Sequence, residues 1–103
     1  MNMQDITVEE LKERMDKGEK LNLVDVRRPQ EFDEFNIGGK LIPIGDLPAR
    51  LAELESMKDE EIILHCRSGN RSAQAKLFLE DYGFTKVRNL LGGLLEWQDV
   101  HGS

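Results

Sequence analysis

The sequence has one cysteine, two histidines and three prolines, and none of its apolar runs is longer than three residues. One cysteine cannot form an intramolecular disulfide, and the cysteine and histidines do not have the spacing of a zinc site. We therefore expect neither a metal nor a cofactor. Three apolar residues are too few for a membrane span or a signal peptide, which indicates a cytoplasmic location, no membrane partner and a thiol that stays reduced.

The charge balance narrows the choice of partners. The chain has 14 lysines and arginines against 20 aspartates and glutamates, a net charge of -6. Binding to phosphate backbones requires a basic face, so this balance argues against a nucleic-acid partner. With 39% apolar and 33% charged residues, a chain of this length fits one compact domain, which we expect to cover residues 1–103.

Helices and strands are expected to alternate along the chain. Thr7 followed by Glu10 is a capping pair, and it predicts a helix that ends at Gly18. Asp46 is expected to cap a further helix. The other expected elements are strands at 21–26, 41–44, 61–65 and 86–90, a short helix or turn around 32–37, and helices over 46–54, from 72 to Gly83 and over 94–97. This alternation favours an α/β fold, a mostly parallel sheet with helices on both faces.

Cys66 stands where chemistry is expected in such a fold. It follows the strand 61–65, and the loop 66–71 leads from it directly into a helix. Ligands of parallel sheets bind at the carboxyl ends of the strands, where free amides of helix N-termini point outward. Amides and nearby arginines lower the pKa of a cysteine from about 8.5 into roughly the 3.5 to 7.5 range. We therefore expect a reactive thiolate rather than a small buried apolar side chain.

Three segments carry a family resemblance. The segment Cys66-Arg67-Ser68-Gly69-Asn70-Arg71-Ser72 resembles the active-site loop of the rhodanese (thiosulfate sulfurtransferase) family, and residues 25–32 and 87–97 are similar to its first and last signatures. The resemblance implies a small rhodanese-like domain with a parallel sheet of five strands. It also implies that Cys66 takes sulfur from a small anionic donor such as thiosulfate, holds it as a persulfide, and passes it to a thiol or protein-thiol acceptor, or to cyanide in assays.

Each loop residue then receives an expected role in substrate binding. Gly69 allows backbone conformations closed to other residues, so that successive amides converge on one point. Ser68 and Asn70 are expected to contribute mainly backbone N–H groups. Ser72 is expected to cap the following helix. We interpret the remaining two residues, Arg67 and Arg71, as the side chains that attract and orient an anionic donor, since a guanidinium matches oxyanion geometry.

Three polar residues near this loop are interpreted as structural. Asp25 ends a neighbouring strand, where it is expected to accept hydrogen bonds from loop amides. Arg27 is expected to pair with Glu31, four positions further along the chain. His65 precedes Cys66 directly, and because neighbouring strand side chains point to opposite faces, we expect it to be structural rather than a catalytic base.

Two other classes of function remain open on the sequence. A cysteine at a helix N-terminus with an arginine nearby also describes cysteine-dependent phosphatases and arsenate reductases. Their signature places cysteine and arginine one residue further apart than Cys66 and Arg71, and the shorter loop suits a single sulfur atom better than a tetrahedral anion. A non-catalytic module that senses anions, or a redox-sensing thiol, is the second alternative, because fold alone does not fix function.

Overall fold

The computed structural model describes residues 3–102 around a parallel sheet of four strands in the order β2-β1-β3-β4. The strands are β1 (Asn22–Asp25), β2 (Lys40–Leu41), β3 (Ile62–His65) and β4 (Val87–Asn89). The two central strands are in register along their whole length, so that Asp25 pairs with His65 at their carboxyl ends. Polar residues far apart in the sequence are thereby gathered at one edge.

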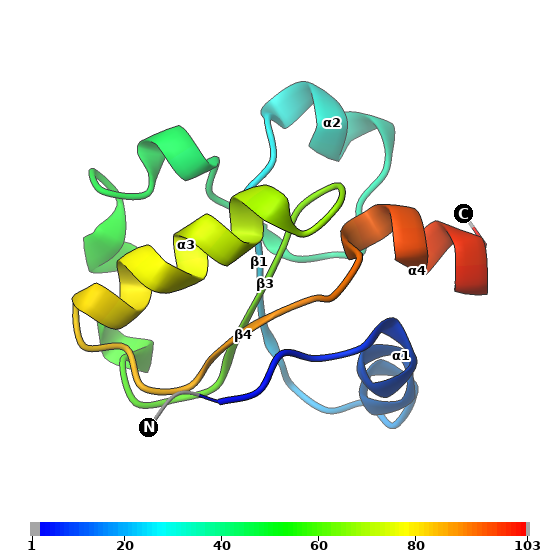
Figure 1. The fold of residues 1–103 in the computed structure, drawn as a ribbon, viewed down its shortest axis with the longest axis horizontal. Helices are drawn as coiled ribbons and strands as arrows, with labels where there is room; N and C mark the ends of the chain where they lie inside the picture. Colours follow the sequence, from blue (N-terminus) through cyan, green and yellow to red (C-terminus); the bar gives the residue numbers. More distant parts are fainter. Residues whose placement is uncertain (1–2, 103) are drawn as a thin grey trace.

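Helical segments cover both faces of the sheet, as expected (Figure 1). One side carries α1 (Val8–Asp16) and α4 (Gly93–His101), and the other carries α3 (Asn70–Asp81) with the 3-10 segments η1 (Ile44–Asp46) and η2 (Leu51–Met57), while α2 (Pro29–Glu34) follows β1. Strand side chains alternate between these layers. Ile62 and Leu64 join the apolar cluster beneath α3, and Ile63 joins the one beneath α1 and α4. No helix within residues 3–102 is both long and apolar enough to cross a membrane.

The sheet has four strands, not the expected five. The candidate for a fifth is the segment at Ile6, which forms only an isolated parallel bridge with Leu90. Thr7 follows immediately and caps α1, accepting a hydrogen bond from the Glu10 amide at 3.1 Å. The chain turns into the helix after one paired residue, so no strand can develop there.

The connection between β2 and β3 also differs from expectation. In place of a strand at 41–44 and a helix at 46–54 capped by Asp46, the chain forms the two-residue β2 and then η1 and η2. The Leu47 amide donates to the Ile44 carbonyl at 3.2 Å, a 3-10 bond. Pro48 has no amide with which to make the α-helical bond to that same carbonyl. Asp46 therefore ends η1 instead of capping an α-helix.

Candidate active site

Backbone amides surround the sulfur of Cys66. The residue follows β3 at its carboxyl end, and the chain curls back so that Gly69 and Ser72 donate their N–H groups to Sγ at 3.1 and 3.4 Å. The Ser72 hydroxyl lies 3.3 Å from the same sulfur. A sulfur among converging donors is in an environment suited to a negative charge.

The side chain of Cys66 is also completely buried, with 0% of its surface exposed. It belongs to the apolar cluster beneath α3, yet its sulfur accepts hydrogen bonds from the loop. Burial raises the pKa of Cys66, whereas hydrogen bonds from the hydroxyl and amide of Ser72 and the amides of Gly69 and Ser68 lower it. The donors outweigh burial, and the pKa of Cys66 lies below its ordinary value.

The helix after the loop begins earlier than expected. Gly69 has a φ of 100°, a left-handed conformation that suits glycine, and it is the cap of α3, which starts at Asn70. Ser72 is thus not the cap but the third residue of the helix, where its side chain is buried against the sulfur. Ser68 and Asn70 are exposed on the outside of the turn.

The N-terminus of α4 holds the loop from behind. Leu94 and Leu95 donate their amides to the carbonyls of Cys66 and Arg67, each at 2.9 Å. A Cβ on Gly93 would lie 2.6 Å from main-chain atoms of Cys66 and Arg67, so only glycine allows this approach. These bonds fix the first two carbonyls of the loop away from the sulfur. The sequence indicated a helix over 94–97, but not that its N-terminus would support the Cys66 loop.

Asn89 is a supporting residue that the sequence analysis missed. It is the last residue of β4, it is buried, and its side-chain Nδ2 donates to the Gly69 carbonyl at 3.1 Å. The signal that could have revealed it is its position, because the carboxyl ends of parallel strands meet at one edge. A polar side chain at the end of β4 therefore faces the same region as Cys66.

The two loop arginines are in different situations. Arg71 is bound to Glu31 through hydrogen bonds of 2.7 and 3.0 Å, and this arginine is the main reason that the pKa of Glu31 is lowered to about 2. Arg67 is exposed, and its side chain has no hydrogen bond or ion pair to another residue within 3–102. It lines a cavity of about 170 Å³ whose wall also includes Glu31, Glu34, Phe35 and Leu94. Arg67 is therefore the loop cation available to a ligand.

Asp25 and Arg27 form a buried pair next to the site. Asp25 accepts the backbone amide of Arg27 at 3.0 Å, a loop amide as expected, and its Oδ2 lies 2.8 Å from the guanidinium. The expected pairing of Arg27 with the Glu31 carboxylate is wrong: Arg27 donates to the main-chain carbonyls of Glu31 and Phe35 instead. Because its guanidinium turns back to the nearer Asp25, the carboxylate of Glu31 is left to Arg71.

His65 is enclosed in the interior. Neither ring nitrogen has a hydrogen-bond partner among the residues that the structure describes, and Nδ1 lies 4.0 Å from Oδ2 of Asp25. Burial lowers the pKa of His65 to about 4, although Asp25 acts in the opposite sense. The imidazole is thus neutral at ordinary pH, consistent with a structural residue. Within residues 3–102, no three His, Cys, Asp or Glu side chains are grouped so that they could hold a metal ion.

Comparison with known proteins places this geometry in a family. The model of the rhodanese-like domain matches residues 7–100. A protein named "Sulfurtransferase" from Allochromatium vinosum is 37% identical over 90% of this chain and 86% of its own. The Bacillus subtilis "Putative sulfur carrier protein YrkF" is 36% identical over 90% of this chain, which spans only 50% of that relative. The crystal structure of a rhodanese-like domain protein from Staphylococcus aureus superposes with a TM-score of 0.83, at 33% identity over 92% of this chain and 91% of that one. The chain belongs to the rhodanese-like domain family.

Proposed function

We propose that this protein is a sulfurtransferase that carries sulfane sulfur on Cys66. The observation that supports this most strongly is the position of Sγ within hydrogen-bond distance of the amides of Gly69 and Ser72. Donors already in place stabilise both the attacking thiolate and the terminal sulfur anion of a persulfide. Relatives whose names refer to sulfur transfer or sulfur carriage align with 90% of this chain.

The reaction has two steps, in which one sulfur atom passes first from the donor to Cys66 and then from Cys66 to an acceptor. The Cys66 thiolate attacks the outer sulfur of thiosulfate, an S–S bond forms as the S–S bond of the donor breaks, and sulfite leaves with the electron pair. The enzyme then holds Cys–S–S⁻. An acceptor, either a thiolate or cyanide in an assay, attacks the terminal sulfur and regenerates the Cys66 thiolate. Such a double displacement gives ping-pong kinetics.

An anionic donor is the substrate class that the guanidinium of Arg67 favours, in a cavity whose wall also includes Arg27, Glu31 and Glu34. Arg67 lies next to Cys66 in the chain, has a free guanidinium within the described residues, and lines the cavity beside the loop. A guanidinium matches the oxygen geometry of a sulfonate group such as that of thiosulfate. The longer-range field of Arg71 is reduced by its ion pair with Glu31. We therefore assign donor binding to Arg67 ahead of Arg71.

Access to the sulfur requires local movement of the loop. Cys66 is fully buried, and the cavity that Arg67 lines does not include it. The persulfide sulfur projects about one S–S bond, roughly 2 Å, beyond Sγ. Its formation therefore displaces the amides of Gly69 and Ser72 slightly outward from their present positions, and they become donors to the outer sulfur.

Intact-protein mass spectrometry tests this function. After exposure to thiosulfate the protein gains one sulfur atom, and subsequent cyanide removes it, whereas Cys66→Ser shows neither change. A phosphate ester is offered in a parallel reaction, since the phosphatase alternative requires its hydrolysis. Absence of the sulfur adduct together with turnover of the phosphate ester would overturn the proposal.

A further inference from the structure

A chain of three buried polar side chains extends from the sulfur into the sheet. Sγ of Cys66 lies 3.3 Å from Oγ of Ser72, which donates to Oδ1 of Asn89 at 2.5 Å. Ser72 and Cys66 are 0% exposed and Asn89 is 6% exposed. Because water does not reach these groups, the few protons they share must satisfy all of their hydrogen bonds.

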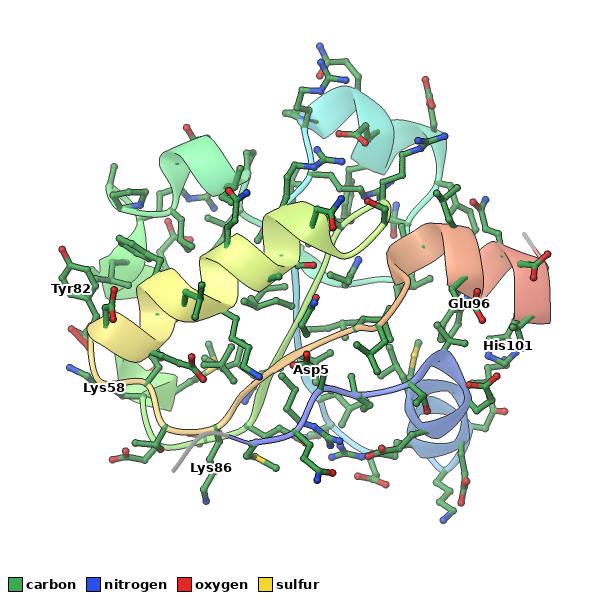
Figure 2. The ribbon with its side chains drawn as sticks, viewed as in Figure 1. Asp5, Lys58, Tyr82, Lys86, Glu96 and His101 are labelled. Carbon is green, nitrogen blue, oxygen red and sulfur yellow. The ribbon has the colours of Figure 1, made fainter. Side chains whose placement is uncertain are left out.

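The orientation of the Asn89 amide is fixed by its other partner. Its Nδ2 donates to the carbonyl of Gly69, an atom that can only accept, so Oδ1 must face Ser72. The main chain of Asn89 is anchored as well: its amide donates to the Asp5 carboxylate at 2.9 Å, and its carbonyl accepts from the Ile6 amide at 3.0 Å. Figure 2 shows Asp5 beside β4, where it makes this contact.

The number of protons on these side chains limits which hydrogen bonds can form at the same time. The Ser72 hydroxyl has one proton, and Oδ1 of Asn89 has none, so the 2.5 Å contact uses the proton of Ser72. In that state only the S–H of Cys66 can supply a proton to the contact between sulfur and hydroxyl. Once Cys66 ionises, the sulfur can only accept, and the Ser72 hydroxyl must turn from Asn89 to the sulfur in order to stabilise it.

We infer that Asn89 is a positioning residue that competes with the Cys66 sulfur for the single hydroxyl proton of Ser72. Its Nδ2 at the same time anchors Gly69, whose amide lies 3.1 Å from Sγ, nearer than the Ser72 amide at 3.4 Å. The inference goes beyond the proposed function, on which it depends for its role in turnover. The competition itself exists whether or not the thiol transfers sulfur.

A double-mutant cycle between Asn89 and Ser72 tests the competition, with the acid dissociation constant of the thiol as readout. That constant is measured from the pH dependence of alkylation by iodoacetamide, which needs no sulfur donor. Ser72→Ala should decrease it, because the hydroxyl is one of the groups that lower the pKa of Cys66. Asn89→Leu removes the competing acceptor and should increase the acid dissociation constant of the thiol. This increase should be about fivefold larger when Ser72 is present than in the Ser72→Ala background, which is the value of one hydrogen bond.

The charged groups around the loop are the same in every member of this cycle. They are Arg67 of the loop, Arg71 of α3, Glu31 of α2, and the pair of Asp25 and Arg27 after β1; the pKa of Arg71 is raised mainly by Glu31 and less by Cys66 and Asp25. Asn22→Leu is the matched control, because Asn22 donates to the Glu61 carbonyl at the opposite end of the sheet. It should leave the alkylation profile unchanged.

The outcomes are separable. If Asn89→Leu shifts the profile equally with and without Ser72, Asn89 does not act through the hydroxyl and the inference is wrong. Should Asn89→Leu fail to fold, as judged by circular dichroism, Asn89→Ala removes the same two hydrogen bonds and is read in the same cycle. Coupling in alkylation without a sulfur adduct in the mass measurement would contradict the sulfurtransferase proposal and leave this inference standing.

Discussion

Glu31 and Arg71 form a two-pronged ion pair, with Nη1 2.7 Å from Oε1 and Nη2 3.0 Å from Oε2. The pair joins α2, which follows the first central strand, to the first turn of α3, which follows the Cys66 loop. The side chains are 33% and 16% exposed, for Arg71 and Glu31 respectively, so the pair is only partly solvated. The carboxylate therefore cancels much of the positive potential that Arg71 would otherwise exert at the sulfur.

Removing this negative charge should speed the reaction with an anionic donor. In Glu31→Gln the guanidinium of Arg71 is no longer neutralised, and we expect the second-order rate with thiosulfate to rise about two- to fivefold at low salt, from a Coulomb effect on the order of 1 kcal/mol or less. The rate is measured as sulfite release under kcat/KM conditions. The gain should shrink as salt is added.

Glu53→Gln is the matched control for that substitution. It changes the net charge by the same amount and also removes the carboxylate partner of an arginine, since Glu53 binds Arg50 and Lys40. Glu53 differs from Glu31 in that it lies in η2 and does not pair with Arg71. It should leave the rate unchanged. A lower rate in Glu31→Gln would mean that Glu31 is needed to hold Arg71 in place, and the electrostatic interpretation would fail.

Removing the charge of Arg67 should slow the reaction with the donor, in contrast to Glu31→Gln. Its guanidinium is free of partners within the described residues and lines the cavity beside the loop. We expect Arg67→Gln to decrease kcat/KM for thiosulfate about tenfold, as for a lost charge-assisted hydrogen bond, and to flatten the salt dependence. Lys86→Gln carries the same charge change far from the loop (Figure 2) and should behave like the unmodified protein. Equal rates for the two variants would remove Arg67 from donor binding.

The sequence was sufficient to predict the layers of the fold and the position of Cys66 because both depend on local patterns. The alternation of expected strands and helices predicted a sheet covered on both faces, and the structure has apolar clusters on both sides, with Ile62 and Leu64 in one and Ile63 in the other. A cysteine between a strand and a helix was enough to predict amides around its sulfur. The role of each loop residue in binding a substrate stays a prediction.

The sequence could not reveal the partners that arrive from distant parts of the chain. Arg27 and Glu31 are at helical spacing, yet Arg27 pairs with Asp25 and Glu31 pairs with Arg71, 40 positions away. Asn89 reaches the loop only because β4 lies beside β3. The choice among such partners is decided by tertiary packing, whereas spacing along the chain reports only local contacts.

His65 should make the protein less stable in mild acid. Its pKa is about 4 in the folded protein, chiefly because of burial, against 6.5 for an unperturbed histidine, so the unfolded chain binds a proton that the folded one does not between these values. Stability therefore falls as the pH drops from about 6.5 toward 4, by about 2 kcal/mol between pH 7 and pH 5. Urea unfolding of wild type and His65→Leu at both pH values measures this. The same loss in both proteins would assign the effect to other groups.

Gly93 should be essential to the Cys66 loop because there is no space for a side chain, in addition to its left-handed backbone angle. Gly18 is the control, because its φ of 77° is also left-handed, like the 60° of Gly93, but nothing lies within 4 Å of a Cβ added there. A Cβ on Gly93 would lie 2.6 Å from the carbonyls of Cys66 and Arg67. Gly18→Ala should therefore cost about 1 to 2 kcal/mol of unfolding free energy, and Gly93→Ala about 1 to 3 kcal/mol more. Displacing these carbonyls also moves the amides around Sγ, and a misplacement of about 1 Å lowers catalysis on the order of 100-fold. Denaturant unfolding and sulfite release, measured on both variants, separate the two effects. If Gly93→Ala lost stability but kept full activity, the α4 N-terminus would support the fold without setting the geometry at Cys66.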